Sequence, residues 1–413
     1  MLRSYLKLAW KVLLRRKFFT FASLFGVAFT LLVLTVATAL LDHVFAPHAP
    51  ETRMSRTLGL YGLAETGPTS TRTYFAGWPF VKRYMQDLPG AEKVALLQIQ
   101  HEVDSYPRGR KVASYLKRTD GAFWQVLDFE FLEGQPYTED DERQARPVAV
   151  INETTRARFF GEGTVAVGRT IEVDGQRFRV VGVVKDVPFL RVVPFADVWV
   201  PISTARSDAY KREFVGDFFA LVLADPARHG ELRREFAARV AAARPPDPRT
   251  FTRFYGGLES LFEFASRSLF SPRLETAHPG RLQGLLAGLA LLFMLLPAIN
   301  LVNLNLSRIL ERTGEIGVRK AFGASSWTLV GQFVVESLML SLVGGALGFV
   351  LSGVVLRLLN ATGVIPYAHL TLNLRIFLWG VVFSAAFGLL SGAYPAWRMS
   401  RLHPVEALRG RTR

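Results

Sequence analysis

The stretch that decides the fold is Arg308-Ile-Leu-Glu-Arg-Thr-Gly-Glu-Ile-Gly-Val-Arg-Lys-Ala-Phe-Gly-Ala324, which is short and charged and lies between two long apolar segments. Its charged residues share one face at helical spacing, and they are Arg308, Glu311, Arg312, Glu315 and Arg319. Glu315 precedes Arg319 by four residues, which supports a helix, and Gly323 suits its end. We expect a short helix along the cytosolic membrane surface with its charges toward a soluble partner. The alternative is a solvated loop that only orients the membrane segments.

Long apolar segments divide the rest of the chain, half of which is hydrophobic. A helix that crosses a bilayer needs about 20 mainly apolar residues. We therefore predict four transmembrane helices, at roughly 18–41, 282–306, 327–357 and 376–397. The first segment is longer than the apolar core of a signal peptide, which is about 7–15 residues, so we interpret it as an uncleaved anchor. Residues 1–17 have the pattern of a basic amphipathic helix, or of a continuation of the first span.

The net charge of +15 is concentrated in short flanks of these segments. Residues 1–17 carry only basic charges, and the stretch 308–324 and the tail after Trp397 are also basic. The segment 42–281 is almost balanced, with 33 basic and 31 acidic residues. Lys- and Arg-rich short flanks stay in the cytosol, so we expect both termini inside and 42–281 outside. This distribution also argues against a nucleic-acid-binding surface.

The segment 42–281 has the pattern of an α+β domain with hairpins. We expect strands at Val94–Tyr106, Lys111–Thr119, Val148–Ile151, Val198–Pro201 and Phe218–Leu223. Asp174-Gly175 predicts a type I′ turn in a hairpin over 169–184. Helices are expected at Glu153–Phe160, ending at Gly161, and at Arg228–Arg244, ending before Pro245; Asp247–Tyr255 and Leu258–Leu269 are possible connecting helices.

Three parts of the chain resemble a known family. Glu311–Ala324 resembles the E-R-x-x-E-I-G-[IV]-R-[KR]-A-[LFM]-G-A signature of MacB/FtsX-type ABC transporter permeases. Phe131–Tyr137, Val148–Glu153, Arg158–Gly161 and Val180–Pro188 are similar to that family's periplasmic core domain. Tyr394–Arg409 is similar to its C-terminus, with Met399 where alanine is usual. The resemblance is weakest over 42–125.

The resemblance implies two contacts with a separate ATPase. The first is a coupling helix at about 311–324, with Glu311, Arg312, Glu315, Ile316, Arg319, Lys320 and Phe322. The second lies in the tail and comprises Arg401, Pro404, Glu406 and Arg409. The alternative for the tail is a basic stop-transfer segment.

Small and polar residues recur inside the apolar segments. Glycines spaced four apart permit close helix approach, namely Gly284 and Gly288, Gly344 and Gly348, and Gly388 and Gly392. Asn300 and Asn303 lie at one end of the second segment, either at a seam between subunits or at the membrane surface. Glu336 is a costly residue within a membrane; we expect a structural polar contact rather than a proton relay.

The composition excludes several classes of chemistry. The chain has no cysteine, and its seven histidines are scattered without a metal-ligand spacing. It contains no Gly-x-x-x-x-Gly-Lys-Ser/Thr phosphate loop, no Gly-x-Ser-x-Gly elbow and no His-Glu-x-x-His motif. We therefore expect no catalytic residue, no metal and no bound cofactor in this chain. The resemblance implies that ATP and Mg²⁺ are held by the partner ATPase.

The predicted fold is an α-helical membrane protein with four transmembrane helices and an α+β extracytoplasmic domain between helices 1 and 2. The predicted domains are 1–41, the periplasmic core 42–281, the transmembrane domain 282–397 and the tail 398–413. The predicted function is that of a permease that couples a dimeric ATPase to movement of the outer domain, in a bacterial inner membrane. The expected partners include a second permease copy or a paralogue and a periplasmic adaptor; the cargo is not readable. The alternatives are a regulator of a cell-wall hydrolase and, more weakly, a proton-coupled carrier.

Overall fold

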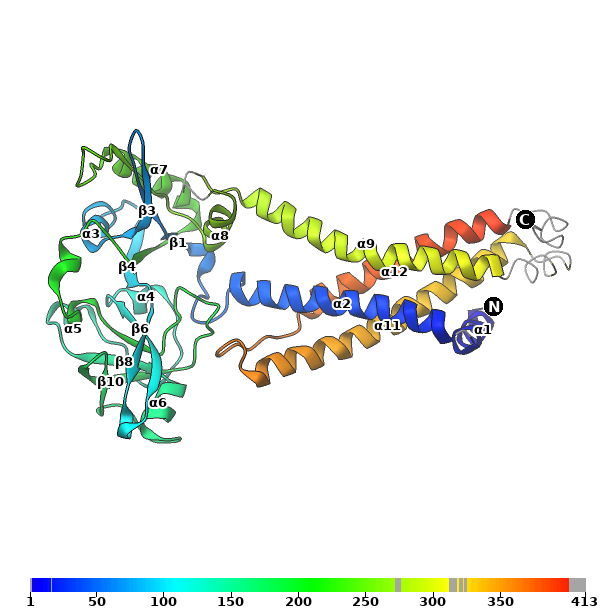
Figure 1. The fold of residues 1–413 in the computed structure, drawn as a ribbon, viewed down its shortest axis with the longest axis horizontal. Helices are drawn as coiled ribbons and strands as arrows, with labels where there is room; N and C mark the ends of the chain where they lie inside the picture. The colour runs from blue at the N-terminus through cyan, green and yellow to red at the C-terminus, as the bar shows by residue number, and fades with distance from the viewer. Residues whose placement is uncertain are drawn as a thin grey trace. The chain divides into compact units, whose positions relative to one another are not determined.

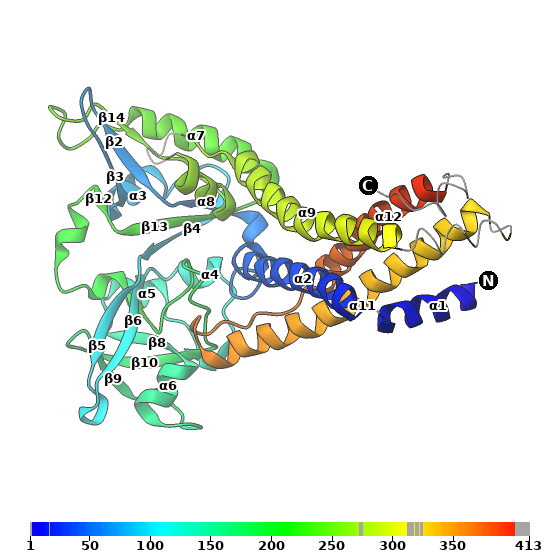
Figure 2. The same cartoon turned by 45° about the vertical axis from the view of Figure 1, so that its right-hand side comes forward.

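The computed structural model describes residues 2–15, 17–271, 276–311, 318, 322 and 325–400. The chain divides into two compact units. A helical unit contains residues 1–42, 284–364 and 370–413, and an α+β unit contains residues 43–283 and 365–369. The segment 365–369 therefore belongs to the α+β unit although both of its flanks belong to the helical unit. Figures 1 and 2 show the elements of each unit in two views.

The described part of the helical unit consists of one short helix with basic side chains, α1, and of four long apolar helices. They are α1 (Leu2–Arg15), α2 (Lys17–Phe45), α9 (Pro279–Glu311), α11 (Ser326–Thr362) and α12 (Leu374–Ser400). Ser325 caps α11, because its Oγ accepts a hydrogen bond from the Thr328 amide, as the sequence predicts. Two helical segments, Lys17–Phe45 of α2 and Val330–Thr362 of α11, are long and apolar enough to cross a membrane. The apolar segments of α9 and α12, Pro279–Leu295 and Leu374–Leu390, are shorter within the described residues.

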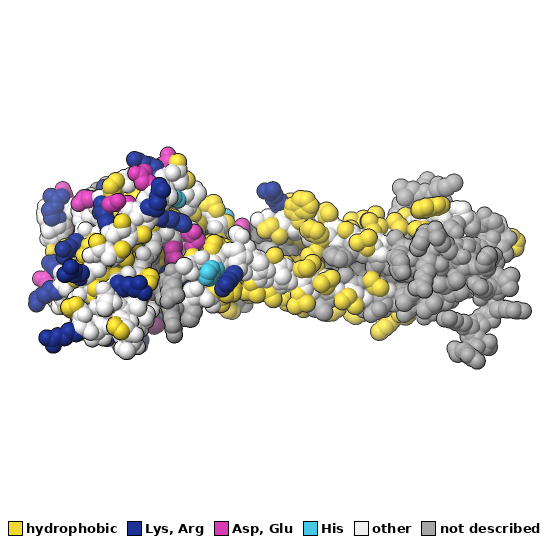
Figure 3. Space-filling model, turned by 90° about the horizontal axis from the view of Figure 1, so that it is seen from above, with side chains coloured by type: hydrophobic (Ala, Val, Ile, Leu, Met, Phe, Trp, Pro, Cys, Tyr) yellow, Lys and Arg dark blue, Asp and Glu magenta, His cyan; other side chains and the backbone are white. Residues whose placement is uncertain are grey.

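The surfaces of the two units differ in chemistry. Hydrophobic side chains cover much of the described surface along the long helices, whereas Lys, Arg, Asp and Glu side chains gather over the α+β unit (Figure 3). Phe21, Phe25 and Phe29 project from one face of α2, with exposed fractions of 67%, 58% and 48%. Such a row of exposed aromatic rings is unfavourable in water and suits contact with lipid.

The α+β unit is built on one mixed sheet. Its strands are β1 (Thr57–Leu60), β2 (Leu63–Thr66), β3 (Thr71–Ala76), β4 (Ala91–Gln98), β5 (His101–Ser105), β6 (Val112–Thr119), β7 (Phe131–Gly134), β8 (Val148–Asn152), β9 (Thr170–Val173), β10 (Gln176–Val184), β11 (Val198–Pro201), β12 (Val215–Gly216), β13 (Phe218–Ala224) and β14 (Arg253–Tyr255). Its α-helices are α3 (Trp78–Tyr84), α4 (Phe123–Val126), α5 (Glu139–Arg143), α6 (Glu153–Phe160), α7 (His229–Ala242) and α8 (Leu261–Phe270).

The sheet has two halves that meet at β4 and β6. The strand order is β14-β2-β3-β13-β4-β6-β11-β8-β10-β7, with β1 paired to β13 and β9 to β10. β4 and β13 pair along most of their length, from Phe218↔Gln98 to Ala224↔Ala91. β4 and β6 pair only at Leu97↔Thr119. We call the strands from β14 to β4, together with β1 and β12, the first half, and the strands from β6 to β7, together with β5 and β9, the second half.

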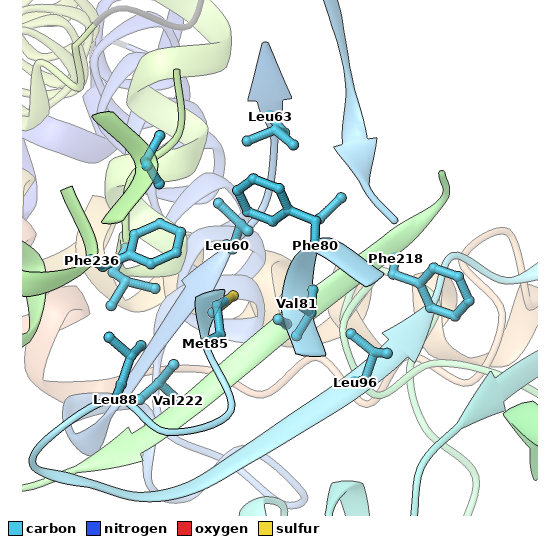
Figure 4. Close-up of a cluster of buried hydrophobic side chains, with 14 of the residues drawn as sticks. Leu60, Leu63, Phe80, Val81, Met85, Leu88, Leu96, Phe218, Val222 and Phe236 are labelled. Carbon is cyan, nitrogen blue, oxygen red and sulfur yellow. The ribbon is translucent and has the colours of Figure 1, made fainter. Parts of the chain in front are cut away.

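The apolar cores lie on both faces of this sheet. Successive side chains of a strand point to opposite faces, so Leu96 enters a different core from Ala95 and Leu97. On one face, α3 and α7 cover the first half through Phe80, Met85 and Phe236 (Figure 4). On the opposite face, a core that includes Phe123 and Trp124 of α4 runs beneath both halves. The largest apolar core shared by strands of both halves therefore lies on this face.

Most local predictions for this unit are confirmed, because short-range chemistry decides them. α6 has the predicted bounds, with Asn152 as its N-cap and Gly161 at φ 98° after its last turn. The hairpin turn has positive φ at Asp174 (54°) and Gly175 (61°), as a type I′ turn requires.

Two predictions are wrong and one is incomplete. The strand expected at Val94–Tyr106 is two strands, β4 and β5, which pair with different partners. The helix considered for Asp247–Tyr255 is replaced by β14, which pairs with β2. The α+β class is correct. However, β8 pairs in parallel with β10, and β6 pairs in parallel with β11; the hairpin pattern of the sequence does not predict these parallel pairs.

Candidate functional site: the chain connections of the α+β unit

Three segments connect the α+β unit to the helices, and each is held by buried polar contacts. They are residues 46–51, which follow α2, the segment 365–369 between α11 and α12, and α8, which precedes α9 in the chain. The first two reach the same loop, residues 187–196 between β10 and β11, which we call the connector loop.

Arg191 of the connector loop binds the segment that follows α2. Its Nη1 donates to Glu51 Oε2 at 2.8 Å and to the His48 carbonyl at 3.4 Å, and its Nη2 donates to the Ala46 carbonyl at 2.8 Å. Only 1% of Arg191 and 6% of Glu51 is exposed. Burial raises the pKa of Glu51, against the effect of the Arg191 guanidinium. A buried pair of this kind fixes geometry because either partner alone would be a costly unpaired charge.

Lys117 of β6 binds the backbone of the connector loop. Its Nζ donates to the Val192 carbonyl at 2.8 Å and to the Val193 carbonyl at 2.6 Å, and the side chain is fully buried. Burial lowers the pKa of Lys117 to about 7, and the nearby Glu51 opposes that effect. The connector loop is therefore bonded both to a central strand, β6, and to residues 46–51, which follow α2.

The segment 365–369 is bonded to the same region. Phe189 of the connector loop donates its amide to the Pro366 carbonyl at 3.1 Å. Tyr367 Oη donates to Asp197 Oδ1 at 2.8 Å. Asp197 also accepts from Asn152 Nδ2 at 2.9 Å and from the Tyr115 amide at 2.8 Å. Burial next to the Asp197 carboxylate raises the pKa of Tyr367, which keeps its hydroxyl proton available for this bond.

The third connection, through α8, reaches the first half of the sheet. Arg267 of α8 donates to both Glu259 oxygens, at 2.7 and 2.9 Å, and Glu259 forms an isolated bridge with Gly59 of β1. Glu263 accepts two hydrogen bonds from Arg233 of α7, at 2.9 and 2.7 Å. The two connections at the connector loop thus join the second half, whereas α8 joins the first half.

Glycines of the helical unit lie at close helix contacts. A Cβ at Gly344 would lie 2.8 Å from Val27, and one at Gly348 would lie 3.1 Å from the Ala28 carbonyl. A Cβ at Gly388 would lie 2.7 Å from Ser341 Oγ. No atom of the described chain lies within 4 Å of a Cβ at Gly284 or Gly288. These two glycines therefore face open space within one chain.

The polar residues predicted within the apolar segments lie on two helices, α9 and α11. Glu336 lies on α11 with 3% of its surface exposed, beside the equally buried Gln332 and Ser337. Asn300 and Asn303 lie on α9. The buried position of Glu336 agrees with a structural polar contact and does not by itself test a proton relay.

The predicted contacts with an ATPase fall mainly outside the described residues. Arg312, Glu315, Ile316, Arg319 and Lys320 are not described, and neither are Arg401, Pro404, Glu406 and Arg409. Glu311 ends α9. Phe322 donates its amide to the Val318 carbonyl at 3.1 Å, which is one helical turn, and Phe322 is 88% exposed. Gly392 lies on α12.

No pattern in the sequence indicates the contacts of the connector loop. In the sequence Arg191 and Lys117 resemble any surface cation, and Tyr367 lies in a short loop between two apolar segments. Their importance depends on contacts with residues more than 70 positions away, such as Lys117 with Val192 and Arg191 with Glu51. The Pro-rich run around Pro188 and Pro194 marks a loop but not what the loop binds.

Two family profiles match this chain, one mainly over the α+β unit and the other over the helical unit. The profile of the MacB-like periplasmic core domain matches residues 19–239, which is more than half of the chain, and that of the FtsX-like permease C-terminal domain matches residues 287–404. The first match includes the segment 42–125, where the sequence motifs are weakest.

Two curated relatives and one solved structure illustrate the similarity. A probable export ATP-binding/permease protein of Pseudomonas fluorescens strain Pf0-1 is 28% identical over 287 residues, or 69% of this chain and 42% of that protein. The macrolide export ATP-binding/permease protein MacB of Wolinella succinogenes is 27% identical over 326 residues, or 76% of this chain and 48% of that protein. The periplasmic region of MacB from Actinobacillus actinomycetemcomitans has a TM-score of 0.37 at 14% identity, over 52% of this chain and 93% of that one.

The chain thus spans less than half the length of these two curated relatives. The matched profiles together cover residues 19–239 and 287–404, which include most of the α+β unit and most of the long helices. The chain belongs to the family of MacB/FtsX-type ABC transporter permeases.

Proposed function

We propose that this chain is the permease subunit of an ABC-type complex that transmits the nucleotide cycle of an ATPase to the α+β unit, in support of export. The chain would act in a bacterial inner membrane, with four transmembrane helices, both termini in the cytosol and the α+β unit in the periplasm. ATP and Mg²⁺ would bind to the ATPase rather than to this chain. The names of the curated relatives, which are export permeases, support this assignment.

One observation carries the mechanical part of the proposal. The segments that follow α2 and α11 in the chain belong to the α+β unit. Buried polar contacts hold them within it: Arg191 with Glu51, and Tyr367 with Asp197. A displacement of α2 or of the α11–α12 loop would therefore act directly on the connector loop. A displacement of α9 would act on the other half of the sheet through α8. In this proposal, motion of the helices reaches the α+β unit at two separate points, the connector loop and α8.

The cytosolic side of the proposal uses the stretch 311–324. Glu311, Arg312, Glu315, Ile316, Arg319, Lys320 and Phe322 would form a coupling helix that docks on the ATPase, and Arg401, Pro404, Glu406 and Arg409 would form a second contact. The exposed ring of Phe322 supports this assignment, because such a ring at a membrane surface suits an apolar pocket of a partner. A second permease would pack against this chain, and the open glycines Gly284 and Gly288 offer a face for it.

The docking contact can be tested with the cognate ATPase. The experiment reconstitutes the chain in nanodiscs and measures ATP hydrolysis with wild type, Glu315→Lys and Arg319→Glu. We expect wild type to change the hydrolysis rate, and each charge reversal to remove most of that change without lowering the amount of reconstituted chain. Arg177→Glu, an exposed change in the α+β unit, is the matched control. An equal rate change with Glu315→Lys and with wild type would exclude this docking site.

The alternative function, regulation of a periplasmic cell-wall hydrolase, makes a different prediction for the α+β unit. A crosslinking experiment in cells with a photoreactive residue at Tyr106, which is 64% exposed, would recover a hydrolase under the alternative and an export adaptor under the proposal.

A further inference from the structure

A cavity of about 590 Å³ lies at the junction of the two halves of the sheet. Its walls come from both halves: Trp78, Lys82 and Leu96 from the first, and Asp120 and Glu142 from the second. Both views show α3 and α5, which carry several of these residues, on the same side of the sheet (Figures 1 and 2). The volume falls within the range of small-molecule sites, which is about 300–1,000 Å³.

The junction behind this cavity contains few backbone bonds. Only Leu97 and Thr119 pair between β4 and β6. Asp120 extends the junction, because its amide donates to the Leu96 carbonyl at 3.0 Å and its Oδ2 accepts from the Leu96 amide at 3.0 Å. The opposite face of the junction is filled by α4 and its apolar core. The cavity thus lies where the two halves of the sheet meet, on the face opposite to α4.

Two aromatic rings form part of the wall. Trp78 and Tyr210 both line the cavity, and their rings lie edge to face with centroids 6.2 Å apart. Lys82 Nζ lies 5.6 Å from the centre of the Trp78 ring. The ring face therefore already accommodates a positive charge, which the electron distribution of an indole favours.

The inner wall carries carboxyl groups that the chain does not neutralise by direct pairing. Asp120 Oδ1 accepts from the Phe123 amide at 3.0 Å, and Glu142 Oε2 accepts from the Gly121 amide at 3.2 Å. Neither carboxyl belongs to an ion pair among the described residues, and Lys82 acts on both only through its field. Burial raises the pKa of both groups, that of Asp120 to about 8.

Two other acids that line the cavity, Glu139 and Glu92, form ion pairs. Glu139 binds Lys93 at 3.0 Å and Glu92 binds Arg56 at 2.6 Å. A ligand that reaches the inner wall would consequently meet aromatic rings and two acids without an ion-pair partner. A bound cation would favour the ionised form of both carboxyl groups and would gain both contacts, whereas an anion would gain no ionic contact with them.

We propose that this cavity binds an organic cation that also carries an aromatic or apolar group. The positive charge lies between the carboxyl groups of Asp120 and Glu142 and takes over the role of Lys82 against Trp78. The apolar group packs against Trp78 and Tyr210. This binding does not depend on the ATPase, so it stands or fails separately from the proposed function.

The experiment uses the full chain in nanodiscs and measures fluorescence anisotropy with two dyes of the same ring system. Rhodamine 6G is a cation, and fluorescein is an anion; empty nanodiscs correct for partition into lipid. We expect saturable binding of rhodamine 6G only. Glu142→Gln should weaken it about tenfold, since one ionic contact is lost, and Trp78→Leu about fivefold. Glu172→Gln, which is exposed on β9, should leave the affinity unchanged.

A third variant gives a change in the opposite direction. Lys82→Met removes the resident positive charge and should tighten rhodamine 6G binding several-fold, a result that misfolding would not produce. The proposal is overturned if rhodamine 6G shows no saturable binding, if fluorescein binds equally well, or if Glu142→Gln and Lys82→Met both leave the affinity at the wild-type value.

Discussion

Tyr367, in the short segment between α11 and α12, donates its hydroxyl to Asp197 beside β11 at 2.8 Å. The backbone of Tyr367 has φ 57°, a region that bulky residues rarely adopt. Such a conformation persists where surrounding contacts enforce it. The bond therefore fixes the segment 365–369, which lies between α11 and α12 in the chain, within the α+β unit.

Tyr367→Phe should loosen this loop without unfolding the chain. Asp197 keeps its bonds to Asn152 and the Tyr115 amide, so the expected cost is about 1–2 kcal/mol. Hydrogen–deuterium exchange of residues 365–369 should be faster by about tenfold, and that of β13 unchanged. Tyr106→Phe, at an exposed tyrosine, is the control. Identical exchange of the loop in wild type and Tyr367→Phe would show that the bond has no such role.

Arg191→Met should be among the more damaging single changes in the α+β unit. It leaves Glu51 buried without its guanidinium, and loss of one partner of a buried pair costs about 3–5 kcal/mol. Thermal unfolding of the purified chain measures this cost. Arg177→Met is the control, because Arg177 and Glu172 form an exposed pair worth about 0–1 kcal/mol. Equal stabilities of the two variants would contradict the contact.

Gly344→Val should separate α2 from α11. A Cβ at Gly344 would lie 2.8 Å from Val27, and overpacking of this kind typically costs about 1–3 kcal/mol. The control is Gly353→Val on the same helix, where no atom lies within 4 Å of an added Cβ. The measurement is the melting temperature in nanodiscs. A lower value for Gly353→Val than for Gly344→Val would reverse the expected order.

Asp120 should make stability depend on pH. Burial raises its pKa to about 8 in the folded chain, whereas the unfolded value is about 3.9. Between these values the folded state holds a proton that the unfolded state has lost, so stability falls as pH rises from about 4 to about 8. Through Asp120 alone, the free energy of unfolding falls by at most about 1.4 kcal/mol per pH unit.

Asp120→Asn removes this titration, so the stability of wild type relative to the variant should decrease from pH 5 to pH 8. Chemical unfolding at three pH values measures the difference. A difference that stays constant over that range would show that Asp120 is ionised in the folded chain throughout.

The sequence predicted elements that are decided by neighbouring residues. The cap at Asn152, the stop at Gly161 and the turn at Asp174-Gly175 all depend on side chains or backbone freedom within a few positions. The long helices α2 and α11 follow from apolar length alone. The glycines Gly344, Gly348 and Gly388 could be named as close-contact positions, although their partner residues could not.

The sequence could not predict what distant pairing decides. β1 pairs with β13 across more than 160 residues, with Thr57 opposite Leu223, and nothing near Thr57 indicates that partner. β14 is short and takes its conformation from β2. Lys117 and Arg191 are cations that the fold buries, against their usual preference for the surface. The connector loop and the cavity arise only from such contacts.

The central claim places the coupling stretch and the α+β unit on opposite sides of a membrane, and cysteine labelling tests it most directly. The chain has no cysteine, so a single introduced thiol reports one position without background. Val318→Cys in the coupling stretch and Tyr106→Cys in the α+β unit are both at exposed residues. The reagent is a maleimide that does not cross membranes, applied to spheroplasts and to inside-out vesicles. The account predicts that Tyr106→Cys is labelled only in spheroplasts and Val318→Cys only in inside-out vesicles; labelling of both from the same side would contradict it.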